Sequence, residues 1–499
     1  MKTLLLCSAA VLGILPGIAS TSKAELAGSK PNIVFVLTDD QGMGDLSSMG
    51  NPILRTPNLD AFYKKSTLFT QFQVNPTCTP TCTPTRAALM SGRPPFAVGV
   101  SHTILCRERL ALDVVTFPQA IQTAGYKNGI FGKWHLGDEG EEYLPNNRGF
   151  DEVFIHGAGG LGQEVFGDFI GNKDAKYFDN IILHNDTVVQ TKGFCTDVFF
   201  QAALGWMKKQ INAKQPYFSY ISLNAPHGPF YAPEKNIKRF KELGLDTNAA
   251  ARYGMIENID TNFGLLMRKL EEWQQLENTL VIFMTDNGMS MGRFKMKGKL
   301  QTAFNANMKG TKNSLWEGGT RVPSFWYLKG KTQPGTDIQA LAADIDFYQT
   351  FCALAGAKIP ESKLPPGGRS LLQLLENPRA DWPDRTLFFN KGRWGTKGLT
   401  KEKSKYASAV RTQKWRLVHH ELLYDVNNDL MQENDLAAKH PEIVAMLQKE
   451  YETWRQSVQA PLAINEGLET PKIGDYFLQI LQAKQLKKSG IPNWTPDSL

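Results

Sequence analysis

Long hydrophobic runs, internal repeats and a strong charge imbalance are missing from most of this 499-residue chain. Beyond its first residues there is no run of about 18 consecutive apolar residues, as a transmembrane helix needs. No segment recurs with a period of about 20 to 50 residues, which argues against a repeat architecture. The formal net charge is only +7. Composition therefore gives weak support for an anionic partner, and we expect no nucleic-acid partner.

The composition also excludes two classes of chain. Apolar residues make up 42% of the sequence, too many for a disordered protein. The 43 glycines and 27 prolines are too many for a coiled coil. The length allows one large domain together with a smaller one, and a sizeable hydrophobic core.

The N-terminal segment has the pattern of an export signal. Lys2 precedes an apolar stretch from Leu4 to Leu15, which is followed by two alternative cleavage sites that end at Ala19 and Ala24. We therefore predict a signal peptide over residues 1–24 and an exported protein, periplasmic or secreted, with no transmembrane segment. A buried N-terminal helix is the alternative.

The cysteines are few, and an odd number remains after cleavage: Cys78, Cys82, Cys106, Cys195 and Cys352. Export permits disulfides, but at least one of these five residues must be unpaired or modified. Cys78 and Cys82 lie four residues apart. No second close pair of Cys or His residues accompanies them to complete a zinc site.

Short apolar runs alternate with longer helical patterns, which predicts an α/β fold. The runs at Asn32–Thr38, Tyr217–Leu223 and Thr279–Thr285 predict buried strands. Apolar residues at helical spacing between Ile256 and Trp273 predict an amphipathic helix, and a second helix is expected from about Asp197 to Ala213.

The pattern changes near residue 360, after which four short β-like runs follow one another closely. They predict an antiparallel meander over Thr386–Asn390, Tyr406–Thr412, Trp415–His419 and Leu422–Val426. A helix that Pro441 opens follows them. We therefore predict a large domain over residues 30–380, a small α+β domain over 381–460, and an extended surface tail over 461–499.

Polar side chains follow two of the predicted strands directly. Asp39 and Asp40 follow the first strand, and Asp286 and Asn287 follow the last. Ligands bind at the carboxyl ends of strands in open α/β sheets. Three carboxylates and one amide there would suit a hard cation such as Ca²⁺ or Mg²⁺. Solvated turn residues are the alternative.

The segment from Cys82 to Arg93 predicts a short helix. Pro84 suits its first position, with Thr83 before it as a cap, and Gly92 suits its end. Cys82 would then stand at a helix N-terminus, with Arg86 one turn further on. An unmodified cysteine at such a position would have a lowered pKa and be reactive. A packing cysteine in a Thr/Pro-rich turn is the alternative.

This segment resembles the signature of the type I, formylglycine-dependent sulfatases of the alkaline phosphatase superfamily. The signature is Cys-x-Pro-x-Arg, a short helix and a Gly-Arg pair. Other family motifs occur in the family's order: Asp39-Asp40, Gly132–Gly137, Ala225–His227, Thr285–Gly288 and Lys312–Pro323. The resemblance spans residues 30 to 457 and departs from the family at Asn313, where glycine is common. It implies a large, mixed and mostly parallel sheet flanked by helices, with a small C-terminal α+β domain.

The resemblance also implies an activity, sulfuric ester hydrolysis, on a sulfated carbohydrate or an aryl sulfate. It implies that a formylglycine-generating enzyme oxidises Cys82 to an aldehyde, whose hydrate attacks sulfur. Lys133, His227 and Lys312 would bind the sulfate, His135 would act as a base, and Arg86 would hold the nucleophile. The implied ligands of one Ca²⁺, or Mg²⁺, are Asp39, Asp40, Cys82, Asp286 and Asn287.

Two other functions remain open on the sequence. A phosphomonoester or phosphodiester hydrolase of the same superfamily would need further His and Asp ligands for a second metal. A sulfated-polysaccharide-binding protein without catalysis would be expected to lose Cys82, Lys133 or His135, and all three are present. The stretches 157–186, 293–307 and 391–405 are expected to shape specificity.

Overall fold

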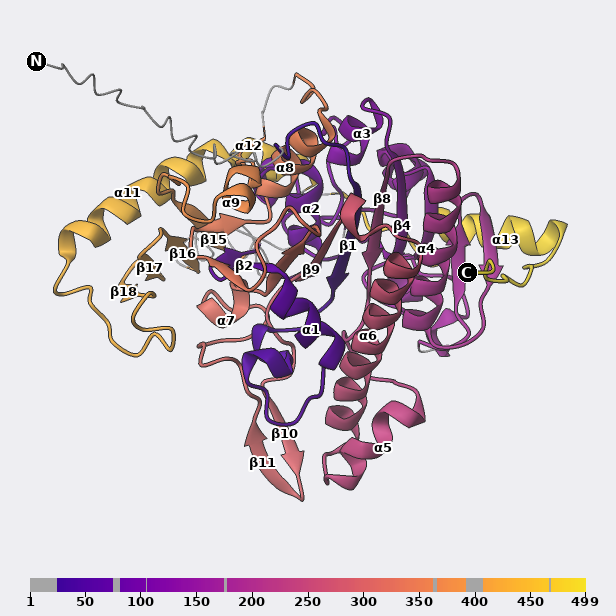
Figure 1. The fold of residues 1–499 in the computed structure, drawn as a ribbon, viewed down its shortest axis with the longest axis horizontal. Helices are drawn as coiled ribbons and strands as arrows, with labels where there is room; N and C mark the ends of the chain where they lie inside the picture. Colours follow the sequence, from indigo (N-terminus) through magenta and orange to yellow (C-terminus); the bar gives the residue numbers. More distant parts are fainter. Residues whose placement is uncertain are drawn as a thin grey trace, which may run out of the picture.

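The computed structural model describes residues 25–74, 81–104, 106–174, 177–361, 366–391, 407–465 and 468–499 (Figure 1). The predicted signal peptide, Cys78 and the stretch 392–406 lie outside the described residues. Within the described ranges, no helix is both long enough and apolar enough to cross a membrane.

A mixed sheet of ten strands forms the centre of the molecule, in the order β13-β2-β12-β9-β1-β8-β4-β5-β6-β7 (Figure 1). The five central strands, β9 to β5 in this order, run parallel, whereas β12, β6 and β7 pair antiparallel with their neighbours. The strands are β1 Asn32–Thr38, β2 Thr67–Phe69, β4 Lys127–Lys133, β5 Glu152–His156, β6 Ile181–His184, β7 Thr187–Gln190, β8 Tyr217–Ser222, β9 Thr279–Thr285, β12 Ser324–Tyr327 and β13 Thr336–Ile338. This arrangement confirms the predicted fold class and the three predicted buried strands.

Helices cover both faces of this sheet. On one face lie α2 Cys82–Ser91, α3 Phe117–Gln122, α8 Asp346–Ala355 and α9 Leu372–Glu376. On the other lie α1 Pro57–Lys65, α4 Cys195–Asn212 and α6 Thr247–Glu272. The predicted helices are confirmed as α4 and α6. Helix α6 begins earlier than its apolar spacing indicates, because the Asp246 side chain caps it by accepting from the Ala249 amide at 3.0 Å.

The double coverage explains why β1 reads as a continuous apolar run. Ile33, Phe35 and Leu37 enter the cluster on one face, and Val34 and Val36 enter the cluster on the other. Successive side chains of a strand point to opposite faces, so both faces need apolar residues.

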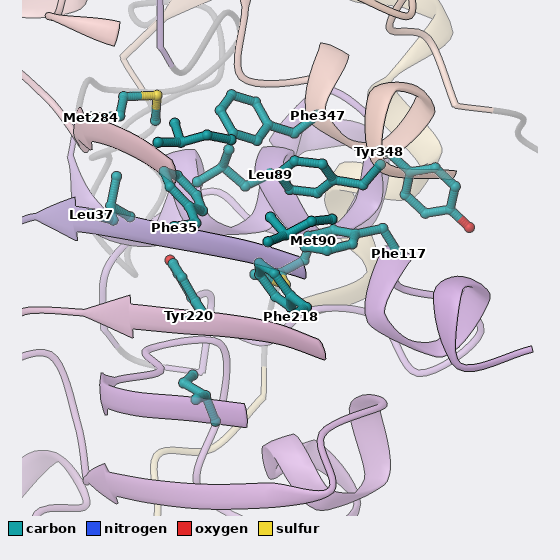
Figure 2. Packing of buried hydrophobic residues seen from close by; sticks show 14 of the residues in the cluster. Phe35, Leu37, Leu89, Met90, Phe117, Phe218, Tyr220, Met284, Phe347 and Tyr348 are labelled. Carbon is teal, nitrogen blue, oxygen red and sulfur yellow. The ribbon is translucent and has the colours of Figure 1, made fainter. Parts of the chain in front are cut away.

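Aromatic residues fill the first of these clusters (Figure 2). The Phe35 ring stacks with Tyr220 of β8 and with Phe347 of α8, at centroid distances of 5.4 and 5.0 Å. Leu89 and Met90 of α2 lie in the same cluster. The helix that carries the signature motif is therefore fixed to the sheet by its apolar residues.

A second, antiparallel sheet of four strands follows, in chain order. Its strands are β15 Leu387–Asn390, β16 Ser408–Arg411, β17 Trp415–Val418 and β18 Leu422–Asp425, which confirms the predicted meander. Helix α11 Pro441–Ser457 covers this sheet through Leu447 and Tyr451. The short helix α12 Gln459–Leu462 follows it.

Two small β-structures complete the described strands. β3 Phe72–Gln73 pairs with β14 Ala342–Ala343. β10 Arg293–Met296 and β11 Lys299–Thr302 form a hairpin. In Figure 1 this hairpin projects at the lower edge of the molecule, beside α5 Glu234–Glu242.

The C-terminal segment differs from the extended tail that the sequence predicts. It contains α13 Phe477–Lys488, and Leu478 is fully buried in the first core cluster. After this helix, the backbone of β7 at Gln190 bonds with Pro492 and Trp494. The residues that α13 buries include Gln479 and Gln482, so no apolar stripe marks the helix in the sequence.

Candidate active site

The carboxyl ends of β1 and β9 bring four polar side chains together. The two strands pair in register up to Thr38 and Thr285, so the residues that follow are neighbours. The Asp40 amide donates to Asp286 Oδ1 at 3.0 Å, and Asn287 Nδ2 donates to Asp40 Oδ1 at 2.9 Å. Asp39, Asp40, Asp286 and Asn287 are all buried.

This cluster fits a hard divalent cation. Asp39 Oδ1 and Asn287 Oδ1 are buried oxygens without a hydrogen-bond partner in the described part of the chain, which is costly unless a ligand satisfies them. One ligand atom each of Asp39, Asp40, Cys82 and His227 lies within 4.8 Å of the others. The carboxylate oxygens of Asp39, Asp40 and Asp286 and the amide oxygen of Asn287 are ligands that suit Ca²⁺ or Mg²⁺.

Each of the three carboxylates is paired with a buried or nearly buried cation. Lys133 Nζ lies 2.6 Å from Asp39 Oδ2, and both side chains are fully buried. Lys312 Nζ lies 2.7 Å from Asp40 Oδ1, and Arg86 Nη2 lies 3.3 Å from Asp286 Oδ2. Lys133 is the last residue of β4, whereas Lys312 lies outside the helices and strands, so two separate parts of the chain bring positive charge to the site.

These pairs set the charges of the carboxylates. Burial alone would raise the pKa of Asp39, but Lys133 and other nearby cations hold it well below its ordinary value. Burial and the adjacent Asp39 carboxylate raise the pKa of Asp286 well above its ordinary value, although Arg86 opposes the shift. A divalent cation would relieve the repulsion between these two carboxylates.

Helix α2 begins at Cys82, after the N-cap Thr81, and so places Cys82 next to the acidic cluster. The predicted start at Pro84 with Thr83 as the cap is wrong by two residues, because Thr83 and Pro84 already lie in the first turn. Lys312 Nζ lies 3.9 Å from Cys82 Sγ. Burial, and then the charge of Asp39, nevertheless raise the pKa of the thiol to about 12. The lowered pKa expected from a helix N-terminus is therefore wrong, because desolvation outweighs the helix and the lysines. An unmodified Cys82 would be a neutral thiol.

Arg86 connects the ends of three strands from within the core. Its guanidinium donates to the Lys133 carbonyl at 3.0 Å, to the Ser222 hydroxyl, and to the Leu223 carbonyl at 3.3 Å. Thr85, beside it, donates to the Asp286 carbonyl at 2.6 Å. The first turn of α2 is thus bonded to the loop that carries Asp286.

The two site histidines use different nitrogens for their hydrogen bonds to the backbone. His135 Nε2 lies 2.8 Å from the Thr103 carbonyl, so Nε2 carries the hydrogen and Nδ1 keeps its lone pair. Burial, and then Lys133, lower the pKa of His135 well below its ordinary value. His227 is bonded through Nδ1 to the Gly228 carbonyl at 2.6 Å, and its Nε2 lies 3.7 Å from Asp40 Oδ2.

A glycine-rich loop lies against both histidines. A Cβ at Gly159 would lie 2.6 Å from His135 Cε1, and a Cβ at Gly160 would lie 3.8 Å from His227 Nδ1. Only glycine allows this approach at position 159. Sequence reasoning did not assign Gly159, Ser222 or Thr103 to the site. The Gly157-Ala-Gly-Gly run is the one signal that could have indicated the close contact.

Comparison with known proteins gives consistent matches. A sulfatase family model matches residues 31–357, and a model of the C-terminal part of N-sulphoglucosamine sulphohydrolase matches residues 311–457. N-acetylgalactosamine-6-sulfatase of Canis lupus familiaris is 30% identical over 420 residues, covering 78% of this chain and 72% of the relative. A sulfatase of Formosa agariphila is 26% identical and covers 90% of this chain and 93% of that protein. The solved structure of Ps i-CgsB with k-i-k-neocarrahexaose superposes with a TM-score of 0.74, at 28% identity over 87% of this chain and 94% of that one.

The chain belongs to the sulfatase family, within the alkaline phosphatase superfamily. It is therefore an enzyme of the sulfuric ester hydrolase class.

Proposed function

We propose that this sulfatase removes sulfate from a sulfated carbohydrate, with a formylglycine derived from Cys82 and one Ca²⁺, or Mg²⁺. The observation that carries the proposal is the position of Cys82, buried beside Asp39 and Asp40 and within 3.9 Å of Lys312. A neutral buried thiol is a poor nucleophile. This environment therefore supports modification of Cys82 rather than direct attack by its sulfur.

The named relatives support the substrate class. One is named N-acetylgalactosamine-6-sulfatase, and another is solved in complex with k-i-k-neocarrahexaose. An aryl sulfate would serve as a small test substrate.

The cation would be held by Asp39, Asp40, Asp286, Asn287 and the modified residue 82. It would supply charge stabilisation for the sulfate oxygens and for the attacking hydroxyl. The formylglycine, once hydrated, would supply that hydroxyl, and a second one through which the sulfate is released.

The remaining side chains bind the ester and move protons. Lys133 and Lys312 would hold sulfate oxygens, whose negative charge grows in the transition state. His227 Nδ1 is engaged with Gly228, so His227 would donate to the leaving oxygen through Nε2 only when it is protonated. Burial lowers the pKa of His227, while Asp40 and Asp39 favour the protonated form. His135 would accept a proton at Nδ1, since its Nε2–H is engaged with Thr103. Arg86 would hold residue 82 and the Asp286 loop in place.

We also propose a division of the chain into domains and a signal peptide. We assign residues 30–380 to a catalytic domain and 381–460 to a small C-terminal domain. The N-terminal pattern supports a signal peptide over residues 1–24 and export to the periplasm or the medium. A formylglycine-generating enzyme would act on the chain before it folds, since Cys82 is buried afterwards.

Sulfate release from matched substrates tests this function. The protein should be made in a host that forms formylglycine and assayed on sulfated oligosaccharides, an aryl sulfate and the matching aryl phosphate. We expect kcat/KM to favour the aryl sulfate over the phosphate by at least about tenfold, or about 1.4 kcal/mol of transition-state binding. A preference for phosphate would overturn the assignment in favour of the phosphoester hydrolases.

A further inference from the structure

The β10–β11 hairpin carries an unusual density of positive charge. Arg293, Lys295, Lys297 and Lys299 stand within seven residues that include no acidic side chain. All four are exposed. Within the described ranges, none of them forms an ion pair with a carboxylate. The Asp246 carboxylate accepts from the backbone amide of Lys295 and not from its ammonium group, so the hairpin presents a concentrated cationic surface.

The segments that lead into and out of the hairpin contact the candidate active site. The Ser290 amide donates to the Asp40 carbonyl at 3.3 Å, and the Lys312 amide donates to the Met289 carbonyl at 2.9 Å. The Ala303 amide donates to the Gly292 carbonyl at 2.9 Å and closes the base. Each strand has four residues, so the hairpin extends about 13 Å beyond this base. Figure 1 shows it projecting from the body of the molecule.

Backbone contacts hold the hairpin in a fixed position. The Asp246 amide donates to the Lys295 carbonyl at 2.8 Å, and the Lys297 amide donates to the Gly244 carbonyl at 2.6 Å. Leu245 and Met296 form an isolated antiparallel bridge between these two bonds. Because the connection between α5 and α6 fixes the hairpin, a ligand would not have to order it on binding.

A groove runs between the hairpin and the elements beside it. It has a volume of about 650 Å³ and is lined by Phe294, Gln301 and Phe304 on the hairpin side and by Arg55 and Tyr253 opposite. Lys299 lies on the same face of the hairpin as Met296, which also lines the groove. Phe294 and Tyr253 are buried against each other, whereas Phe304 is partly exposed. Phe304 and Lys299 therefore suit a pyranose ring that carries a sulfate group.

We propose that residues 293–302, which we call the basic arm, and the adjacent groove bind sulfated units of a polysaccharide chain at a distance from the ester that is cleaved. This inference rests on the proposed function, because only a sulfated carbohydrate bound in the active site would extend to the arm. The substrate would then be a polymer or a long oligosaccharide rather than a monosaccharide. The simpler view, that the lysines only keep an exposed strand edge from pairing, does not explain the groove.

A binding measurement tests the basic arm without turnover. The Cys82→Ala protein and two variants of it would be run by affinity electrophoresis through gels containing ι-carrageenan or chondroitin sulfate. One variant carries Lys295→Gln, Lys297→Gln and Lys299→Gln. The matched control carries Lys484→Gln, Lys487→Gln and Lys488→Gln, which removes the same charge from exposed positions on α13.

We expect at least one sulfated polysaccharide to retard the parent and the control variant equally. The arm variant should bind it about tenfold more weakly, as expected for the loss of three exposed ion pairs. Equal retardation of both variants would overturn the inference. So would the absence of retardation by either polysaccharide, or equal retardation by duplex DNA, which would make the arm a general polyanion surface.

Kinetics then separate this inference from the proposed function. In the active enzyme, the arm variant should raise KM for the retained polysaccharide about tenfold and leave kcat/KM for an aryl sulfate unchanged. A wild-type enzyme that releases sulfate, with no KM difference between the two variants, would contradict the basic arm alone. A wild-type enzyme that releases sulfate from no substrate would contradict the proposed function, and the arm with it.

Discussion

Gln479 Nε2 donates to the backbone carbonyl of Asp168 at 2.9 Å and so joins α13 to the loop that lies against the site histidines. The Asp168 carboxylate in turn accepts from the Gly162 amide at 2.8 Å. Gly159, three residues earlier, touches the His135 ring. The adjacent Leu478 lines the same small cavity as His135. The C-terminal segment therefore helps to position the glycine-rich loop.

Replacing this glutamine should reduce turnover more than its loss of stability explains. We expect Gln479→Ala to lower kcat about tenfold with little change in KM, because His135 would lose its fixed neighbour. The matched control is Gln485→Ala. Gln485 also bonds to the backbone through its amide, but it accepts from and donates to Val188 on β7 and does not contact the loop. Both variants should lose about 1 to 2 kcal/mol in urea unfolding, and equal kcat losses would contradict the positioning role.

The acidic cluster predicts a single bound cation. Elemental analysis of the purified enzyme should show about one Ca or Mg per chain. Removal by EDTA should abolish sulfate release and lower Tm, since a ligand that binds only the folded state stabilises it. Added Ca²⁺ or Mg²⁺ should restore both. Two zinc ions per chain would instead favour a two-metal phosphatase.

Glu317 should make the stability of the protein depend on pH. It is fully buried at the start of α7 Glu317–Thr320 and lies 3.0 Å from Arg411 Nε and 2.6 Å from Arg416 Nη1. Burial opposes ionisation, but the two arginines dominate and lower the pKa of Glu317 to about 2. A lowered folded-state pKa stabilises the protein above the ordinary value of 4.5, and this contribution is lost as pH falls towards 2.

Glu317→Gln should therefore lower the free energy of unfolding at pH 7 by about 3 kcal/mol or more, because two buried guanidinium groups lose their partner. Urea titrations of both proteins should show the difference narrowing below pH 4. Glu433→Gln, at an exposed position, is the control and should change stability by less than about 0.5 kcal/mol. A difference that stays constant between pH 7 and pH 3 would contradict the ionised pair.

The sequence predicts the parts of the site that follow from strand order. Asp39 and Asp286 each follow a buried strand directly, so pairing of the two strands was enough to place them together. Cys82 could be placed at a helix N-terminus from the proline and glycine around it. Its raised pKa could not be predicted, because that shift depends on burial and on Asp39, which only the folded chain brings near.

The C-terminal segment shows a second limit. Helix α13 is held by Gln479, Gln482 and Gln485, which bond to the backbone of residues distant in sequence. Such contacts produce no apolar residues at helical spacing, and so the sequence predicts an extended tail for this segment. The sequence also could not predict which nitrogen of His135 and of His227 bonds to the backbone, because this depends on the positions of the Thr103 and Gly228 carbonyls.

The chemical state of residue 82 in active enzyme tests the central claim most directly. Mass spectrometry should find the peptide that contains Cys82 about 18 Da lighter, as expected for conversion of the thiol to an aldehyde. Cys78 provides an internal control, because the same Cys-Thr-Pro-Thr sequence begins at Cys78 and at Cys82, and Cys78 should remain unmodified. Cys82→Ala and Cys82→Ser should both fold and release no sulfate over repeated turnovers. An active enzyme with an unmodified thiol at position 82, or full activity in Cys82→Ala, would contradict the account.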